Sequence, residues 1–255
     1  MRRLILLWSL LLPLLLQAAT PIENVKIASE SGKSVAKKTE QQRAEEVRTQ
    51  KAAQARQAAE EQAARERVSK VKIEMVPIGG FSLGKYEVTQ GLWQAVMGSN
   101  PSEFTACGED CPVEKVSWND VHTFLTRLNQ LTGKHYRLPT EKEWEQACGS
   151  GEYCGGDNPD VVAWHLGNSN ATTHKVGLKQ PNAKGLYDMS GNVWEWMEDC
   201  YDRNCNTGRV LRGGAWGTKL ELLRSRRTGS GTCLLTGTSS VSAWPTTNPL
   251  IILST

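Results

Sequence analysis

Polar and apolar residues divide the chain into three segments of different character. An apolar run from Leu4 to Leu16 follows the basic pair Arg2-Arg3, whereas residues 34–70 consist almost entirely of Ala, Gln, Glu, Lys and Arg. From residue 71 onward, apolar positions recur at the spacings of short strands and helices. We therefore predict a signal peptide at 1–19, a polar linker and helical spacer at 20–70, and one globular domain at 71–255.

The N-terminal segment has the basic, apolar and small-residue regions of a secretory signal. Its apolar run is shorter than the roughly 20 residues of a membrane-spanning helix, and Pro13 interrupts it. Cleavage near Ala18 or Ala19 would leave a mature chain without a membrane span. The expected location is the periplasm or the medium, and an uncleaved anchor is the alternative.

The second segment predicts a long helix, because residues 34–70 contain no Gly or Pro and are rich in strong helix formers. Glu61 and Arg65 have the favourable i,i+4 spacing. A coiled coil needs large apolar residues along one seam, and only Val35, Val47 and Val68 qualify. A solvated spacer is therefore favoured over the alternative, self-association of the 34–70 helix as a coiled coil.

Local signals in the third segment predict a strand and two helices. Residues 73–78 alternate like a strand and precede a Gly-Gly turn. A helix is expected from Trp118 to Thr132, with Ser117 or Asn119 as its cap, and a second over 141–147. The expected core positions of the first helix are Val121, Phe124, Leu125 and Leu128, and Thr140 with Glu143 forms a capping box for the second.

Composition narrows the range of partners and the compartment. The formal net charge is +3, which is too small to indicate a nucleic acid as partner. Seven cysteines in an exported chain favour disulfides. Three close pairs are expected to bond: Cys107 with Cys111, Cys148 with Cys154, and Cys200 with Cys205. Cys233 remains unpaired, and zinc is the less favoured alternative because no pair has the Cys-x-x-Cys spacing.

Six motifs carry a family resemblance. They are G-K-Y-E-V-T-Q at 84–90, P-V-E-K-V-S-W at 112–118, R-L-P-T-E-K-E-W-E at 137–145, G-L-Y-D-M at 185–189, G-N-V-W-E-W at 191–196 and V-L-R-G-G-A-W at 210–216. In this order they resemble the formylglycine-generating enzyme, or sulfatase-modifying factor, family. The resemblance implies an α+β, C-type-lectin-like fold with little regular secondary structure, here preceded by the long N-terminal helix.

Most of these motif residues also have a structural interpretation, which we favour. The indoles are expected to lie in the core, each with one partner for its N–H group: Trp118, Trp144, Trp194, Trp196 and Trp216. Arg137 and Arg212 are expected to tie loops together through carboxylates or carbonyls. Negative charge at 141–145 suits the start of a helix, so catalysis is not needed to explain it.

A calcium site is implied by the resemblance at the loop between the fourth and fifth motifs. Similar proteins bind calcium through side chains that match Asp188 and Glu195 and through carbonyls that match Gly191 and Val193. Oxygen donors of both kinds suit a hard cation. A second calcium site of the family, matching 163–176, has no clear counterpart.

The two cysteines with which the family's oxidases act are missing. Their positions, counted from Trp216, fall on Thr218 and Leu223. In the aerobic enzymes this pair binds copper(I), a soft ion for which thiolates are suitable ligands. A hydroxyl is a hard ligand and Leu has none, so copper is not expected and no catalytic residue is assigned.

The C-terminal tail departs from the family ending Gly-Phe-Arg-Leu-Ala, since the chain reads V-S-A-W-P at 241–245. Codons for these residues can encode the family ending when they are read one base earlier. A frameshift after about Thr228 is therefore a hypothesis, and it would also account for Cys233 and for a tail that looks foreign to the domain.

Two functions remain. The first is a non-catalytic exported module that binds a peptide, a glycan or a partner protein where the family's enzymes hold a sulfatase peptide. The second is an oxidoreductase that converts a sulfatase cysteine to formylglycine. The missing thiol pair favours the first, because function depends on the site rather than on the fold.

Overall fold

The computed structural model describes residues 21–202, 205, 208–223 and 253–254. The chain divides into two units, 1–58 and 59–255, which are described separately. The expected signal peptide at 1–19 lies outside the described residues, as does Cys233. Within the described part, no helix is both long and apolar enough to cross a membrane.

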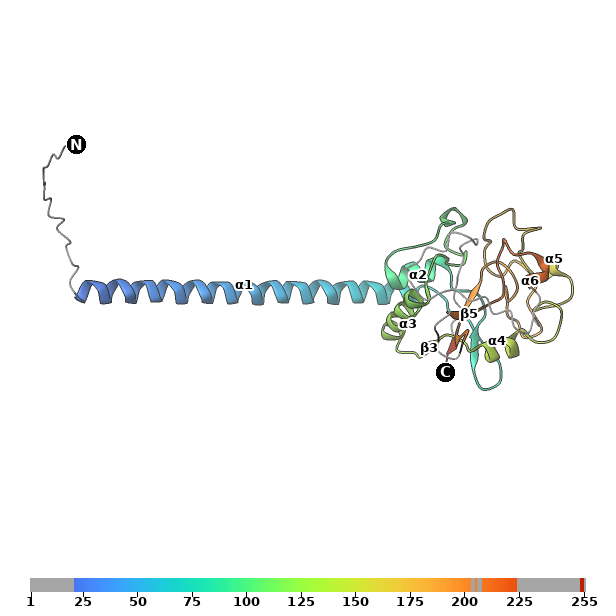
Figure 1. Cartoon of the computed structure of the whole chain (residues 1–255), viewed down its shortest axis with the longest axis horizontal. Helices are drawn as coiled ribbons and strands as arrows, with labels where there is room; N and C mark the ends of the chain where they lie inside the picture. The colour runs from blue at the N-terminus through green and yellow to red at the C-terminus, as the bar shows by residue number, and fades with distance from the viewer. Residues whose placement is uncertain (1–20, 203–204, 206–207, 224–252, 255) are drawn as a thin grey trace, which may run out of the picture. The chain divides into compact units, whose positions relative to one another are not determined.

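The first helix, α1, covers Pro21–Ser69 (Figure 1). It begins before residue 34, so part of the expected polar linker is helical. Glu61 and Arg65 form the expected ion pair at 2.7 Å. Side chains at 35–58 are exposed, including those of Val35 and Val47.

The last turns of α1 belong to the second unit and pack into its core. Ala64 and Val68 are buried, and Arg65 donates to the carbonyl of Leu131. Val68 therefore packs in the core of its own chain and is not available to the seam of a coiled coil. This leaves only two of the three valines for a coiled coil, which is consistent with the spacer interpretation.

One small sheet joins segments that are far apart in the sequence. Its strands are β1 (Met75–Pro77), β2 (Ser82–Gly84), β6 (Leu253–Ser254) and β3 (Tyr136–Arg137), all in antiparallel pairs and in that spatial order. The expected Gly-Gly turn connects β1 and β2, and Gly79 and Gly80 both have positive φ. We expected the tail to be foreign to the domain, but Leu253 and Ser254 pair with β2 and β3. The frameshift stays a hypothesis, because residues 224–252 are outside the described ones.

Two helices build the larger hydrophobic core. α2 covers Gln90–Met97 and α3 covers Trp118–Thr132. Both ends of α3 are confirmed: Ser117 forms a capping box, and Gly133 ends the helix in the left-handed conformation. Its four expected core residues are all buried. Stacked rings of Trp93 and Phe124, with centroids 4.7 Å apart, join the two helices.

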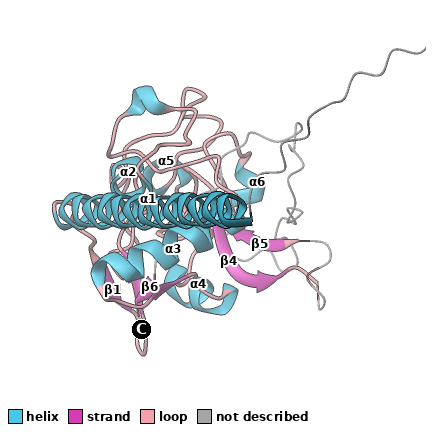
Figure 2. Cartoon of the chain, turned by 90° about the vertical axis from the view of Figure 1, so that its left-hand side faces the viewer, coloured by secondary structure: helices cyan, strands magenta, loops and turns pink. Residues whose placement is uncertain are grey.

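A second core lies beneath α4 and a two-stranded ribbon. α4 covers Glu141–Cys148 with the expected capping box, while β4 (Glu195–Cys200) and β5 (Arg209–Arg212) pair antiparallel (Figure 2). Short helices complete the described elements: η1 (Thr105–Cys107), α5 (Pro159–Val162) and α6 (Leu220–Leu223). Most residues from 149 to 194 form loops.

Candidate functional site

The loop from Asp188 to Glu195 turns sharply before it enters β4. Asp188, Gly191 and Asn192 all have positive φ, a conformation that Asn, Asp and Gly tolerate best. A Cβ at Gly191 would lie 2.1 Å from the carbonyl oxygen of Trp164, so only glycine fits there. The turn directs Asp188 and Glu195 inward, where they are 2% and 0% exposed.

A third carboxylate, Glu87, joins these two from the segment between β2 and α2. It is 2% exposed and accepts hydrogen bonds from Asn192 Nδ2 at 2.7 Å and from the Val193 amide at 3.3 Å. Sequence reasoning missed Glu87. Its signal in the sequence is the carboxylate itself, between Tyr86 and Val88 in the first motif. A buried segment usually has an apolar residue at such a position, so a charged one there is unusual.

Burial raises the pKa of all three carboxyl groups of this Glu87–Asp188–Glu195 cluster. The pKa of Glu87 lies well above its usual value because of burial and then the charges of Asp188 and Glu195. Burial also raises the pKa of Glu195 well above normal and that of Asp188 to about 6. No ion pair among the described residues joins the cluster to a basic side chain, although the charge of Lys179 acts on Asp188.

The cluster contains buried oxygens that lack partners. Asp188 Oδ2 accepts from the Gly177 amide at 2.7 Å, and Glu195 Oε2 accepts from Trp144 Nε1. Within the described chain, Asp188 Oδ1 and Glu195 Oε1 have no hydrogen-bond partner. Leaving a buried charged group unpaired is costly, so the cluster has the chemistry of a site for a hard cation.

Asp188 and Glu195 are therefore both buried at the two ends of the turn that contains Gly191 and Val193, with Glu87 beside it. No three His, Cys, Asp or Glu side chains of the described part are arranged to hold a metal by themselves. A cation held here would also need backbone carbonyls, which the sequence predicts at Gly191 and Val193. Such a mixture of carboxylate and carbonyl oxygens is typical of calcium sites.

Thr218 and Leu223 lie where the family's thiol pair is expected. Both are buried, at 7% and 3% exposure. Both lie against Gly214, where a Cβ atom would contact the two side chains. Thr218 Oγ1 accepts a hydrogen bond from the Ala215 amide at 2.8 Å. Leu223 belongs to a small hydrophobic cluster with Tyr153, Val162 and Ala163. Hydrocarbon and a satisfied hydroxyl thus occupy this position.

The cysteines that the structure describes supply no thiol to this position. The three expected disulfides are present: Cys107–Cys111, Cys148–Cys154 and Cys200–Cys205. Bonded sulfurs are not thiolate ligands, so these pairs do not form a zinc site. Every cysteine among the described residues is in one of these bonds.

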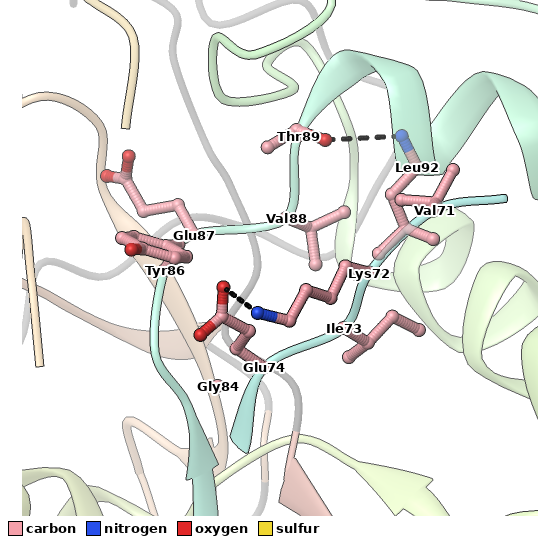
Figure 3. Close-up of a pocket in the computed structure, with 10 residues that line it drawn as sticks. All are labelled: Val71, Lys72, Ile73, Glu74, Gly84, Tyr86, Glu87, Val88, Thr89 and Leu92. Carbon is pink, nitrogen blue, oxygen red and sulfur yellow. Dashed lines mark hydrogen bonds and ion pairs between the residues drawn. The ribbon is translucent and has the colours of Figure 1, made fainter. Parts of the chain in front are cut away.

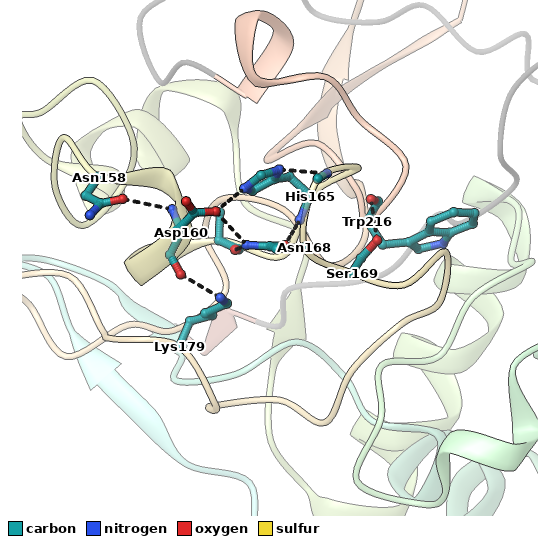
Figure 4. A network of polar contacts seen from close by, with 9 residues as sticks. Asn158, Asp160, His165, Asn168, Ser169, Lys179 and Trp216 are labelled. Atoms are coloured by element: carbon teal, nitrogen blue, oxygen red, sulfur yellow. Dashed lines mark hydrogen bonds and ion pairs between the residues drawn. The ribbon is translucent and has the colours of Figure 1, made fainter.

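A buried histidine near the Thr218 segment, His165, has a structural role (Figure 4). His165 Nδ1 accepts from the Gly167 amide at 3.1 Å, and Nε2 lies 2.9 Å from Asp160 Oδ1. Asn168 also binds Asp160 Oδ1. Because both ring nitrogens contact the protein itself, His165 is not placed to serve as a general base.

Two aromatic pairs lie near the Thr218 segment. Trp164 stacks on His174 with ring centroids 3.7 Å apart, and Phe104 meets Trp216 edge-on at 5.5 Å. Ser169 connects the pairs, since its hydroxyl donates to the Trp216 carbonyl and its own carbonyl contacts His174 Nε2. All four aromatic residues are half-buried, so their rings remain partly available to a ligand.

A pocket of about 50 Å³ lies elsewhere, between residues 71–74 and 84–92 (Figure 3). It has room for only a few water molecules. Lys72 and Glu74 pair across it at 3.1 Å, and the carboxylate of Glu87 points away from this pair. We therefore do not regard it as the binding site.

The structural interpretation of the motif residues holds for most of them. Trp144 and Trp196 are buried, and Trp196 donates to the Val116 carbonyl. Trp118 and Trp194 are partly buried against the larger core. Trp216 is half-buried, and its Nε1 has no partner within the described chain, so it fits the core prediction least.

Both arginines bind carboxylates, as predicted, but they join strands β3 and β5 to α4 rather than tying loops together. Arg137 makes two parallel bonds to the carboxylate of Glu143. Arg212 binds Glu141 and Glu145, on the exposed side of α4. These carboxylates are therefore engaged in ion pairs, which agrees with a structural rather than a catalytic role.

Comparison with known families agrees with the motifs. A family model described as "Sulfatase-modifying factor enzyme 1-like domain" matches residues 32–234. Chaperone protein LppX of Paenibacillus barcinonensis is 33% identical over 195 residues, which cover 53% of this chain and 69% of that protein.

Both inactive and active enzymes are among the similar proteins. Inactive C-alpha-formylglycine-generating enzyme 2 of Mus musculus is 35% identical over 128 residues, covering 42% of this chain and 38% of that protein. Formylglycine-generating enzyme of Streptomyces coelicolor is 34% identical over 139 residues, covering 41% and 42%. The chain thus spans less than half the length of these two relatives.

Solved structures share the fold. Treponema denticola variable protein 1 matches with a TM-score of 0.61 and 27% identity, covering 68% of this chain and 84% of that one. PvdO from Pseudomonas aeruginosa matches with a TM-score of 0.54 and 23% identity, covering 68% and 80%. The mixed helix and strand content is therefore that of formylglycine-generating enzyme relatives, with a long helix at the N-terminus.

Proposed function

The chain belongs to the sulfatase-modifying factor enzyme 1-like family, and we propose that it is a non-catalytic member that binds a partner. The observation that carries this proposal is the pair Thr218 and Leu223, which are buried and packed where the family's oxidases have two thiols. A soft-metal site needs thiolates. Neither side chain can supply one.

A protein or peptide partner agrees best with the relatives. One is named a chaperone and another an inactive enzyme, so the family includes members whose names imply no formylglycine synthesis. Half-buried rings of Phe104, Trp164 and Trp216 offer contact area for apolar side chains. A glycan is the alternative ligand on the same rings.

Calcium has a structural part in this proposal. Asp188 and Glu195, with the carbonyls of Gly191 and Val193, would hold the ion, and the buried position of Glu87 adds a third carboxylate. Two buried oxygens that have no hydrogen-bond partner among the described residues support this assignment. Bound calcium would offset the repulsion among the carboxylates and fix the turn.

The remaining parts of the proposal concern architecture and location. We propose a C-type-lectin-like arrangement for residues 71–255, carried on the α1 spacer and exported by the signal at 1–19 to the periplasm or the medium. Three disulfides agree with an oxidising compartment. Self-association through 34–70 is a further property to test by sedimentation.

Mass spectrometry of a Cys-x-Pro-x-Arg peptide tests the absence of catalysis. The peptide is incubated with the mature protein, copper(I) and oxygen, and we expect no loss of the cysteine thiol. The variant Thr218→Cys/Leu223→Cys is the matched comparison, and it should gain copper(I) binding with little turnover, because catalysis requires the surrounding geometry as well. Clear turnover by the unchanged protein would establish the oxidoreductase instead.

A further inference from the structure

Asn192 connects the carboxylate cluster to the aromatic pairs. It is fully buried, and every polar group of the residue has a partner. Its amide donates to the Trp164 carbonyl (2.9 Å), its carbonyl accepts from the Trp216 amide (2.8 Å), its Oδ1 accepts from the His174 amide (2.9 Å), and its Nδ2 donates to Glu87 Oε2 (2.7 Å) and to the His174 carbonyl (3.1 Å).

The residue type fits this role closely. Asn tolerates the left-handed conformation found here, with φ of 57°. Its side chain offers one acceptor and two N–H donors, and all three are used. Asp has nearly the same shape, but it would place an oxygen against two acceptors, Glu87 Oε2 and the His174 carbonyl.

The bonds of Asn192 lead in two directions. On one side, Glu87 belongs to the cluster with Asp188 and Glu195. On the other side lie Trp164 and His174, which stack on each other, and Trp216. One buried side chain and its peptide groups thus contact both the candidate cation site and three of the four half-buried aromatic residues.

We propose that Asn192 is a positioning residue that couples cation binding at the cluster to the order of residues 164–174 and of Trp216. This inference rests on the calcium assignment in the proposed function. When Glu87 is fixed by a bound cation, the Nδ2 bond fixes the Asn192 amide, and both bonds to His174 hold the segment that carries the stacked pair. Partner binding to these aromatic residues is then stronger with calcium than without it.

Hydrogen exchange of the mature chain tests this coupling. Exchange of the segment 164–176 is measured in calcium chloride and in EDTA, with α3 as an internal reference, and calcium binding is measured by calorimetry. In the wild-type protein, we expect calcium to slow exchange of 164–176 about tenfold more than exchange of α3, a typical size for coupling between sites.

Variants separate coupling from a general effect on stability. Asn192→Asp and Asn192→Gly both keep the left-handed backbone accessible, and they should still bind calcium but show less than about a twofold extra slowing of 164–176. Asn182→Asp is the matched control, because Asn182 is also buried but bonds to the Ala147 carbonyl and the turn at 184–186. It should keep the full effect.

Three outcomes would overturn the coupling. They are equal slowing of 164–176 and α3 in the wild type, full slowing in both Asn192 variants, and a loss of calcium binding in those variants, which would make Asn192 part of the cation site itself. The turnover assay has no calcium variable. If the hydrogen-exchange test fails, the non-catalytic proposal is therefore still judged by the peptide turnover assay.

Discussion

Gly213 and Gly214 are consecutive, and they face two buried sites of opposite character. A Cβ on Gly213 would contact Glu195 of the carboxylate cluster, and one on Gly214 would contact Thr218 and Leu223. The cluster has three buried acids, and two of its oxygens lack a partner in the part of the chain that the structure describes. The Thr218–Leu223 site has its hydroxyl satisfied and its leucine packed.

This difference indicates which site still needs a ligand. Buried charges without partners are costly, so either bound protons or a compensating cation should stabilise the cluster. Packed hydrocarbon needs no ligand and stabilises the fold directly. Truncation should therefore destabilise the Thr218–Leu223 site, whereas pH and chelation should affect only the carboxylate cluster.

The largest effect is expected from Leu223→Ala. Removal of a packed, buried leucine should lower the free energy of unfolding by about 2–5 kcal/mol, because it leaves a cavity beside Tyr153 and Val162. Denaturant unfolding measures the change. Leu222→Ala is the control on the same helix, since Leu222 is 37% exposed, and it should cost less than about 0.5 kcal/mol. Equal costs would show that Leu223 is not a packing residue.

The cluster should make the metal-free protein less stable as pH rises. Asp188 has a folded pKa of about 6 against an ordinary value of 3.8, so the folded state binds its proton more tightly than the unfolded state. In EDTA, stability should fall by about 3 kcal/mol between about pH 3 and 7 from this residue alone. Glu87 and Glu195 act in the same direction.

The variant Asp188→Asn isolates this contribution. It keeps an acceptor for the Gly177 amide and tolerates positive φ, but it does not titrate. In EDTA, the fall between about pH 3 and 7 should be smaller by about 3 kcal/mol. Glu143, whose pKa is lowered to about 2 by Arg137, has the opposite sign, but it is the same in both proteins and does not affect their difference. An unchanged pH profile in the variant would contradict the burial of an acid at 188.

Calcium should stabilise the wild-type protein at neutral pH. At a free concentration of about 100 times Kd, binding to the folded state contributes about 2.7 kcal/mol, and EDTA should remove this gain in a thermal melt. Asp188→Asn should lose most of the gain yet melt higher than wild type in EDTA, because one buried charge is gone. Identical melts of the wild-type protein with calcium and with EDTA would argue against the site.

The smallest effect is expected from Thr218→Val, which keeps the shape of the side chain. The Ala215 amide loses its acceptor, and unfolding measurements should show a cost of about 1 kcal/mol. Thr123→Val, on the exposed side of α3, is the matched control and should change stability by less than about 0.5 kcal/mol. A Thr218→Val variant as stable as wild type would mean that the Ala215 bond contributes nothing.

Local signals in the sequence determined the parts of this protein that depend on neighbouring residues. The ends of α3 and α4 were predicted because a cap and its partner lie within one helical turn. The three disulfides were predicted for the same reason, since each pair is separated by six residues or fewer. The start of α1 was missed, because a polar segment containing Gly32 gives a weak helix signal.

The tertiary structure decided the features that bring distant segments together. Glu87 is separated by about a hundred residues from Asp188 and Glu195, and Leu253 pairs with β2 and β3 from the far end of the chain. The sequence showed only that Thr218 and Leu223 replace the family's two thiols. Their burial against Gly214 depends on the fold. Burial, and with it the cost of an unpaired charge, is set by residues that are distant in the chain.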